Sequence, residues 1–315
     1  MRSYAFLLAV LLSAGMVTSC GQTRGNDTAL PDRLSVVATT SMIADLATQI
    51  GGEHVSVTGL MGPGVDPHLY KASAGDVTRL SGADVILYNG LHLEGKMADV
   101  FERMRQRGIP VFAVAEESVT GEDLIDSDLF QGNYDPHIWF DVPLWQGAAR
   151  RVQEILAEAD PLRAAAYRER LASYLAEMDR THAYVRERTA AVPADRRVIV
   201  TSHDAFGYFG RAYGFEVHGL QGISTAAEAG TADVQQLADL VAARRIPAMF
   251  VESSISPRGI EAVQEAVRAR GFEVGIGGTL YGDALGDPDS QAGTYLGMMR
   301  QNIDTIVAAL AGDPV

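Results

Sequence analysis

The sequence predicts two α/β lobes, each built on a parallel sheet, joined by one long backbone helix. Segments typical of strands alternate with segments typical of helices before residue 120 and again after residue 196, a pattern characteristic of parallel sheets covered by helices. Between these regions, residues 162–191 contain neither glycine nor proline. At a rise of 1.5 Å per residue, about 30 residues would form a rod of about 45 Å, which suits a strut spanning both lobes.

The first region holds short β-rich runs separated by segments of helical periodicity. We expect strands at Leu34–Ala38, 55–60, 84–88 and 110–114. We expect helices at 42–50, Ala74–Ser81 and 96–107. Together they predict an N-terminal lobe over residues 34–143.

Helical sequence dominates the next part of the chain, residues 144–192, which we interpret as the linker. Residues 144–158 are amphipathic, and Asp160-Pro161 then provides a helix N-cap followed by proline at the first helical position. The long helix 162–191 follows. The alternative is two helices broken near Asp179.

The alternation of strands and helices then resumes, predicting a C-terminal lobe over residues 193–315. The expected strands are 197–201, 215–218, 247–251 and 272–276. The expected helices are 205–213, 233–243, 258–270 and 294–310.

Length and charge limit the class of protein. A chain of 315 residues favours two domains. The net charge of −14 argues against nucleic acid as a partner, because phosphates need a basic surface.

The N-terminus resembles a bacterial export signal. Arg2 precedes an apolar stretch, residues 5–17, that is too short to span a membrane. The following Val17-Thr18-Ser19-Cys20 resembles a lipobox. We therefore expect residues 1–19 to be a lipoprotein signal peptide, Cys20 to be lipidated, and the polar residues 20–33 to form a flexible tether. The alternative is a signal peptide with an incidental cysteine; either way, Cys20 is the only cysteine, so no disulfide can form within the chain.

Three histidines have local contexts that suggest a metal site. The triplet Asp-Pro-His occurs twice, ending at His68 and His137, and His203 follows a β-branched run directly. Proline stiffens each triplet at its histidine, and imidazole is the commonest metal ligand in proteins. Asp283, in a glycine-rich loop, could complete a set of four. Its rivals by sequence alone are Asp287, Asp289, Glu228 and Glu252.

The remaining signals near these residues are weaker. Asp66, Asp135 and Glu252 are candidates for orienting the imidazoles, although surface or capping roles are equally open. Trp139 and Trp145 are expected to pack beneath the His137 loop. The other four histidines lack comparable contexts and are interpreted as surface or core residues: His54, His92, His182 and His218.

The number of candidate ligands bears on function. Three imidazoles and one carboxylate fill a tetrahedral site, whereas a catalytic zinc keeps one position open for water. Such ligands suit Zn²⁺, Mn²⁺ or Fe²⁺ rather than Ca²⁺ or Mg²⁺. The set therefore favours binding over catalysis, and we do not expect an enzyme.

Several motifs make the chain similar to a known family. It resembles the metal-binding lipoproteins of zinc and manganese ABC transporters, the cluster A-I family, and most closely the TroA type. The resemblance covers the mature chain and is carried by GVDPHLYKAS (64–73), YDPHIWFDVPLW (134–145), VTSHDAFGYFGRAYGFEVHGLQGIST (200–225), VESSI (251–255) and GGTLYGDALGDPDSQAGTYLGMM (277–299).

The resemblance implies more than the residues alone establish. It implies a metal site in the interlobe cleft, with His68 and His137 from the N-terminal lobe and His203 and Asp283 from the C-terminal lobe. It also implies delivery of one Zn²⁺ or Mn²⁺ per chain to a membrane permease with a cytoplasmic ATPase. The protein would lie in the periplasm or be anchored by lipid on the outer face of the cytoplasmic membrane. We expect a monomer.

The chain departs from the patterns of both the zinc-specific and the manganese-specific relatives, which leaves the identity of the metal open. Zinc-specific relatives often carry a histidine-rich acidic loop, but residues 116–134 contain no histidine. Manganese-specific relatives often have glutamate where this chain has His203, so the sequence looks intermediate. The alternative functions are a zinc-dependent hydrolase, against which no His-Glu-x-x-His pair is present, and a surface adhesin.

Overall fold

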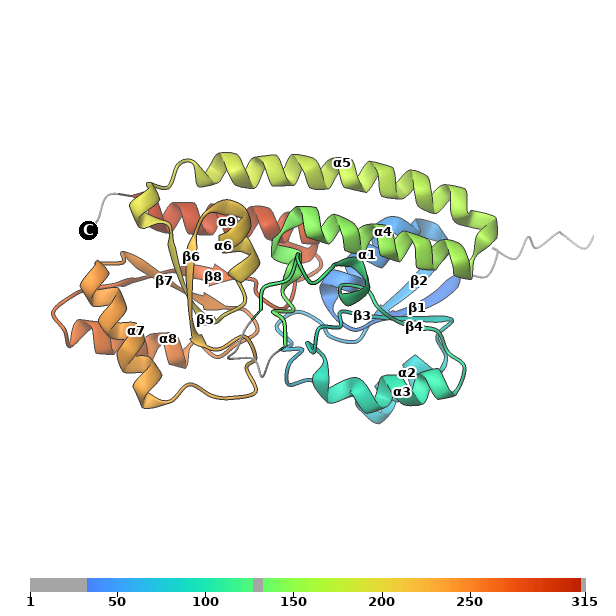
Figure 1. Cartoon of the computed structure of the whole chain (residues 1–315), viewed down its shortest axis with the longest axis horizontal. Helices are drawn as coiled ribbons and strands as arrows, with labels where there is room; N and C mark the ends of the chain where they lie inside the picture. Colours follow the sequence, from blue (N-terminus) through green and yellow to red (C-terminus); the bar gives the residue numbers. More distant parts are fainter. Residues whose placement is uncertain (1–32, 127–132, 313–315) are drawn as a thin grey trace, which may run out of the picture. The chain divides into compact units, whose positions relative to one another are not determined.

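A four-stranded parallel sheet with the order β2-β1-β3-β4 forms the N-terminal lobe (Figure 1). Its strands are β1 (Leu34–Ala38), β2 (Val55–Gly59), β3 (Val85–Tyr88) and β4 (Val111–Ala113). Its helices are α1 (Ser41–Gly51), α2 (Ala74–Ser81) and α3 (Ala98–Gln106).

The two faces of this sheet pack against different helices. Alternate residues of a strand point to opposite faces, and accordingly Val36 packs in a cluster with Ile43 of α1. Its neighbour Val37 packs with Leu80 of α2 and Phe101 of α3. Because both faces are covered, the central strands β1 (LSVVA) and β3 (VILY) are almost continuously apolar, whereas the edge strand β2 (VSVTG) is not.

The C-terminal lobe contains two parallel strand pairs, β5 with β6 and β7 with β8. Their bounds are Val198–His203, Glu216–Gln221, Ala248–Glu252 and Gly275–Leu280, and β5 also contacts β7. The helices are α6 (Gly207–Tyr213), α7 (Thr231–Arg244), α8 (Arg258–Arg268) and α9 (Tyr295–Leu310). Short 3₁₀ turns connect elements along the chain: η1 (Gly52–His54), η2 (Gly95–Met97), η3 (Glu116–Ser118), η5 (Ile138–Phe140), η6 (Pro161–Arg163), η7 (Ala194–Arg196) and η8 (Gln291–Gly293).

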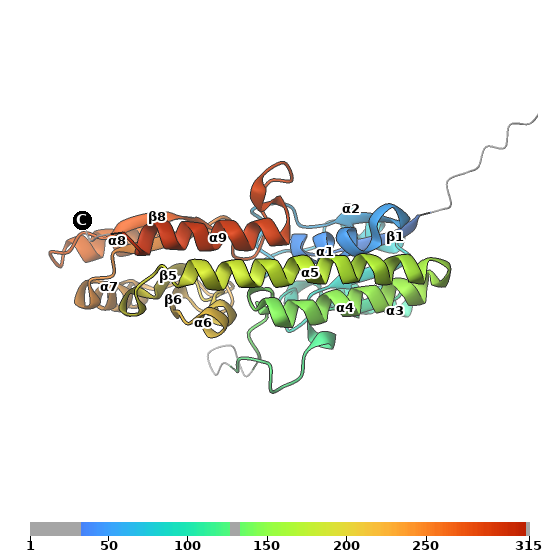
Figure 2. The same ribbon diagram turned by 90° about the horizontal axis from the view of Figure 1, so that it is seen from above.

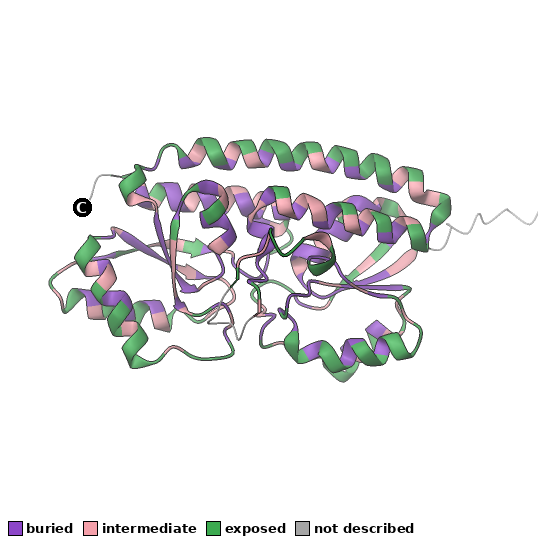
Figure 3. Ribbon diagram, viewed as in Figure 1, coloured by how far each residue is buried: buried purple, intermediate pink, exposed green. Residues whose placement is uncertain are grey.

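One helix, α5 (Ala164–Thr189), passes both lobes and lies between α4 (Val142–Ala159) and α9 when seen from above (Figure 2). Its 26 residues are continuous through Asp179, so the single-helix prediction is confirmed. Its buried residues recur at helical spacing on one face, whereas its outer face is exposed in Figure 3. They are Tyr167, Leu171, Tyr174, Met178, Thr181, Val185 and Thr189.

Helix α5 is tied to elements of both lobes by polar contacts as well as by packing. The Tyr174 hydroxyl donates to Asp45 of α1, and the Tyr184 hydroxyl donates to Asp304 of α9. One apolar cluster also includes side chains from both lobes, such as Ile43, Trp139 and Phe250. This shared core favours small adjustments of the lobes over a wide hinge motion.

The strand predictions were correct in order and type but not at every end. The last strand, expected at 272–276, is observed at Gly275–Leu280. Its sequence, GIGGTL, has low intrinsic strand preference. Pairing with β7 nevertheless places it in the sheet, with a register shift at Met249/Phe250. Strand β5 also extends to His203, two residues beyond its expected end.

The structure is a computed structural model that describes residues 33–126 and 133–312. The predicted signal peptide 1–19, Cys20 and nearly all of the predicted tether lie outside the described residues. Residues Arg33–Val315 group as one unit, so the lobe boundaries near 143 and 193 stay predictions. None of the described helices has the combined length and apolar character needed to cross a membrane.

Candidate metal centre

Four side chains from four distant parts of the chain meet in the interior. His68 lies in the loop between β2 and α2, His137 directly precedes η5, His203 ends β5, and Asp283 follows β8. One potential ligand atom of each lies within 4.8 Å of those of the other three, and all four residues are buried. The structure thus brings together the residues singled out from the sequence.

The ligand atoms face one another at distances that fit a single ion. The two Nε2 atoms of His68 and His137 are 3.3 Å apart. Asp283 lies 3.3 Å from Nε2 of His137 through Oδ1, and 3.3 Å from Nε2 of His203 through Oδ2. Tetrahedral zinc with bonds of 2.0–2.1 Å would space its ligand atoms by about 3.3–3.4 Å.

Several of these buried polar atoms have no hydrogen-bond partner within the described residues. They are Nε2 of His203 and both carboxylate oxygens of Asp283. Burying unpaired polar atoms is unfavourable, and such atoms call for an explanation such as an ion. A cation among the four side chains would satisfy all of them, so the group could hold one metal ion.

Carboxylates contact the distal nitrogens of two of the imidazoles. Oδ1 of Asp135 lies 2.7 Å from Nδ1 of His137, and Oε2 of Glu252 lies 2.8 Å from Nδ1 of His203. Such pairs fix the ring orientation and leave Nε2 free to bind a metal ion. Glu252 also accepts from the backbone N–H of His203 at 2.9 Å.

The third predicted orienting residue, Asp66, contacts the backbone of His68 rather than its ring. One oxygen accepts from the His68 N–H at 2.8 Å, and the other accepts from the Thr225 hydroxyl at 2.6 Å. Among the described residues, Asp283 is the only carboxylate in ion-pair contact with His68. The ring of His68 is therefore held differently from the other two.

Burial and charge shift the pKa values of the four residues in different directions. Burial lowers the pKa of His68 to about 3. Burial also acts to lower the pKa of His137, but Asp135 and Asp283 together raise it to about 9. Burial acts to lower the pKa of His203 as well, but the nearby carboxylates of Glu252 and Asp283 hold it well above the usual range. Although burial acts to raise the pKa of Asp283, His203 and His137 keep it well below its usual range.

Trp139 positions the loop that carries Asp283. Its ring packs edge-on against His137 with centroids 5.1 Å apart, and Trp145 packs beyond it, as predicted. In addition, the Trp139 Nε1–H donates to the Gly282 carbonyl at 3.1 Å. This bond between the lobes was not predicted, because the sequence gives no signal that residues 139 and 282 are neighbours.

Gly282 is required by its close approach to Glu252. A Cβ at this position would overlap Oε2 of Glu252, the atom next to the His203 ring. We expect Gly282→Ala to displace the carboxylate and weaken metal binding by about 10–100-fold, the usual effect of losing an outer partner. Competition with a chromogenic chelator measures this affinity.

The matched control is Gly222→Ala, because a Cβ there meets nothing within 4 Å. Equal affinities for the two alanine variants would contradict the requirement for glycine at residue 282.

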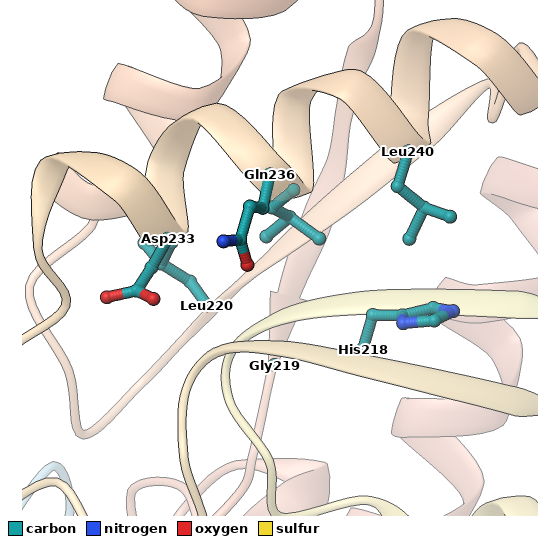
Figure 4. Close-up of a pocket in the computed structure, with 7 residues that line it drawn as sticks. His218, Gly219, Leu220, Asp233, Gln236 and Leu240 are labelled. Atoms are coloured by element: carbon teal, nitrogen blue, oxygen red, sulfur yellow. The ribbon is translucent and has the colours of Figure 1, made fainter.

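The remaining candidates lie away from this cluster. Asp287, Asp289 and Glu228 are exposed. Among the described histidines, His54, His92, His182 and His218 do not join a ligand group. A hollow of about 230 Å³ lies between β6 and α7 (Figure 4), and its lining includes His218 but none of the four clustered residues. The candidate metal centre is therefore a buried site and not a surface pocket.

The chain matches the model of the family described as "ZnuA: Zinc-uptake complex component A periplasmic" over residues 36–309. The chain belongs to this family. It is 49% identical to the zinc-binding protein TroA of Treponema pallidum over 306 residues, covering 97% of this chain and 98% of that protein. It is 46% identical to the manganese-binding lipoprotein MntA of Bacillus subtilis over 305 residues, covering 96% and 98%.

Family membership extends to the fold. The solved structure of periplasmic zinc-binding TroA from Treponema pallidum matches with a TM-score of 0.87 and 50% identity, over 89% of this chain and all of that one. Family members are metal-binding transport components. Substrate-binding proteins of ABC transporters work with a membrane permease and an ATPase.

Proposed function

We propose that this protein captures one divalent transition metal ion outside the cytoplasm and delivers it to an ABC-type permease for uptake. The proposed ligands are His68, His137, His203 and Asp283. The observation that carries the proposal is the mutual spacing of their buried ligand atoms, all within 4.8 Å of one another. The carboxylate oxygens of Asp283 also have no hydrogen-bond partner in the part of the chain that the structure describes.

The cargo that we propose is Zn²⁺ or Mn²⁺, with Fe²⁺ as a further candidate. Imidazole and carboxylate ligands accept all three ions, and intrinsic affinity rises from Mn²⁺ through Fe²⁺ to Zn²⁺. The two similar relatives differ in the same way, since one is named as a zinc-binding protein and the other as a manganese-binding protein. Availability and the geometry of the site would then decide which ion is carried.

Binding without catalysis is the chemistry that the site supports. Four protein ligands close a tetrahedral site, whereas hydrolysis needs a position open for water. The burial of all four side chains also excludes a substrate from the ion in this conformation. We therefore propose a carrier and not a hydrolase.

The proposed location is the outer face of the cytoplasmic membrane or the periplasm, with a monomeric protein anchored through a lipid on Cys20. The apolar segment 5–17 followed by Cys20 supports this proposal, as do relatives named as lipoproteins. Labelled palmitate should be incorporated into the wild-type protein and not into the Cys20→Ala variant. Equal labelling of both would refute the anchor without affecting the metal site.

Metal content tests the proposed function. Protein purified without added metal, analysed by mass spectrometry for elements, should contain Zn, Mn or Fe. After stripping with a chelator, it should take up one Zn²⁺ or Mn²⁺ per chain in a calorimetric titration. A stripped protein that binds neither ion would refute the proposal.

A further inference from the structure

Among the three histidines of the site, His68 is held by the least regular part of the fold. His203 ends strand β5 and His137 precedes η5, and each ring has its own carboxylate at Nδ1. His68 instead lies in the loop between β2 and α2, and among the described residues its ring pairs with no carboxylate except Asp283. Segments with few fixed contacts open most easily.

The loop that carries His68 has exposed residues on both sides of the ligand. Residues 62–64 are exposed, and Leu69, directly after His68, is 44% exposed. The ligand side chains themselves are all buried, with 1% of His68 exposed and none of the other three. Because exposed residues flank His68 within one loop, we infer that movement of this loop alone would open the site to solvent.

Two contacts hold the loop against the C-terminal lobe. Gly64, with a φ of 71°, passes so close to Ser253 that a Cβ would lie 3.3 Å from the Ser253 carbonyl oxygen. The second contact is the 2.6 Å hydrogen bond that the Thr225 hydroxyl donates to Oδ2 of Asp66. Because Oδ1 of Asp66 binds the backbone N–H of His68, one carboxylate connects the ligand to the opposite lobe.

Thr225 lies in a segment whose neighbouring residues are exposed. It is 5% exposed, but the neighbouring residues 226–228 are exposed. The segment joins β6 to α7, and these two elements are separated by the 230 Å³ hollow (Figure 4). Side chains of α7 such as Gln236 line this hollow, while Leu237 packs with Leu220 of β6 in an apolar cluster.

We propose that the hydrogen bond from Thr225 to Asp66 is a latch that sets how fast the ion leaves, by holding the His68 loop against the C-terminal lobe. The latch rests on the proposed function, because it acts on the bound ion. When the bond breaks, Asp66 loses its anchor, His68 loses its fixed backbone orientation, and the ion is released on this side. Thr225 is thus a positioning residue that never touches the ion.

The test compares Thr225→Val, which has a similar shape but no hydroxyl, with Thr225→Ser, which keeps the hydroxyl. Release of Zn²⁺ is followed by stopped flow with an excess of chromogenic chelator. We expect release from the valine variant to be about tenfold faster than from the wild type, since a hydrogen bond to a charged group is lost. The serine variant should release at nearly the wild-type rate, and all three should bind one ion per chain.

The Thr225 bond is present in the empty protein, so its loss should also lower the unfolding midpoint of the metal-free valine variant. The control for a general structural role is therefore Thr189→Val, which removes a buried hydroxyl bonded to the Val185 carbonyl within α5 and should release the ion at the wild-type rate. If the wild type and the valine variant each bind one ion per chain and release it at the same rate, the latch is refuted. Rapid release from the serine variant, or equally fast release from the Thr189→Val and Thr225→Val variants, would also overturn it. A wild-type protein that binds no ion would refute the proposed function as well.

Discussion

Alanine in place of His68 or His203 should lower the affinity for Zn²⁺ by more than about 100-fold, beyond the usual effect of losing an outer partner. Each substitution removes one of four ligand atoms. Water can fill the gap, but it is a weaker ligand for the ion than an imidazole that the fold holds in place. The remaining carboxylate of Asp283 would also lose its partner at 3.3 Å when His203 is replaced. Calorimetry with competing chelator measures both variants against the wild type.

The matched control for this prediction is His218→Ala. His218 lies in the same lobe as His203, but its Nε2 pairs with Glu216 at the edge strand β6. Its replacement should leave the affinity for Zn²⁺ unchanged. If His203→Ala and His218→Ala retained the same affinity as the wild type, the assigned ligands would be wrong.

Metal binding should strongly stabilise the folded protein. The ion contacts residues that meet only in the native state, and unfolding scatters the four ligands along 216 residues of chain, from residue 68 to residue 283. An ion that binds only the folded state adds about 4.1 kcal/mol to the free energy of unfolding when its concentration is about 1,000 times Kd. Thermal unfolding with Zn²⁺ and with excess chelator measures this difference.

Two comparisons make the stabilisation specific to the site. Mg²⁺ should give no shift, because it prefers oxygen ligands in octahedral geometry. The Asp283→Ala variant should lose most of the shift caused by Zn²⁺. An identical unfolding midpoint with Zn²⁺ and with chelator would show that the ion does not join the two lobes.

The fold could be predicted because its strands and helices carry strong local signals. Leu34–Ala38 is continuously apolar or β-branched apart from Ser35, and α5 lacks helix-breaking residues over its whole length. The exception is β8, whose glycine-rich sequence forms a strand only because β7 pairs with it. Strand ends such as that of β5 at His203 depend on tertiary pairing with β6, which no local pattern encodes.

The site could be predicted only in part, because some of its residues are identified only by their tertiary contacts. The two Asp-Pro-His triplets and the strand-end His203 have recognisable contexts. Asp283 could be ranked only narrowly above Asp287 and its other rivals without the family resemblance, because what distinguishes it is its place in three dimensions. The contacts of Thr225 with Asp66 and of Trp139 with Gly282 join residues more than 140 positions apart, and nothing in the local sequence pairs them.

The most direct measurement is a crystal structure of the zinc-loaded protein with anomalous data collected at the zinc absorption edge. We expect a single strong anomalous peak within about 2.0–2.2 Å of Nε2 of His68, His137 and His203 and of a carboxylate oxygen of Asp283. A peak bound elsewhere, or an ion held by water and only one or two of these four residues, would contradict it.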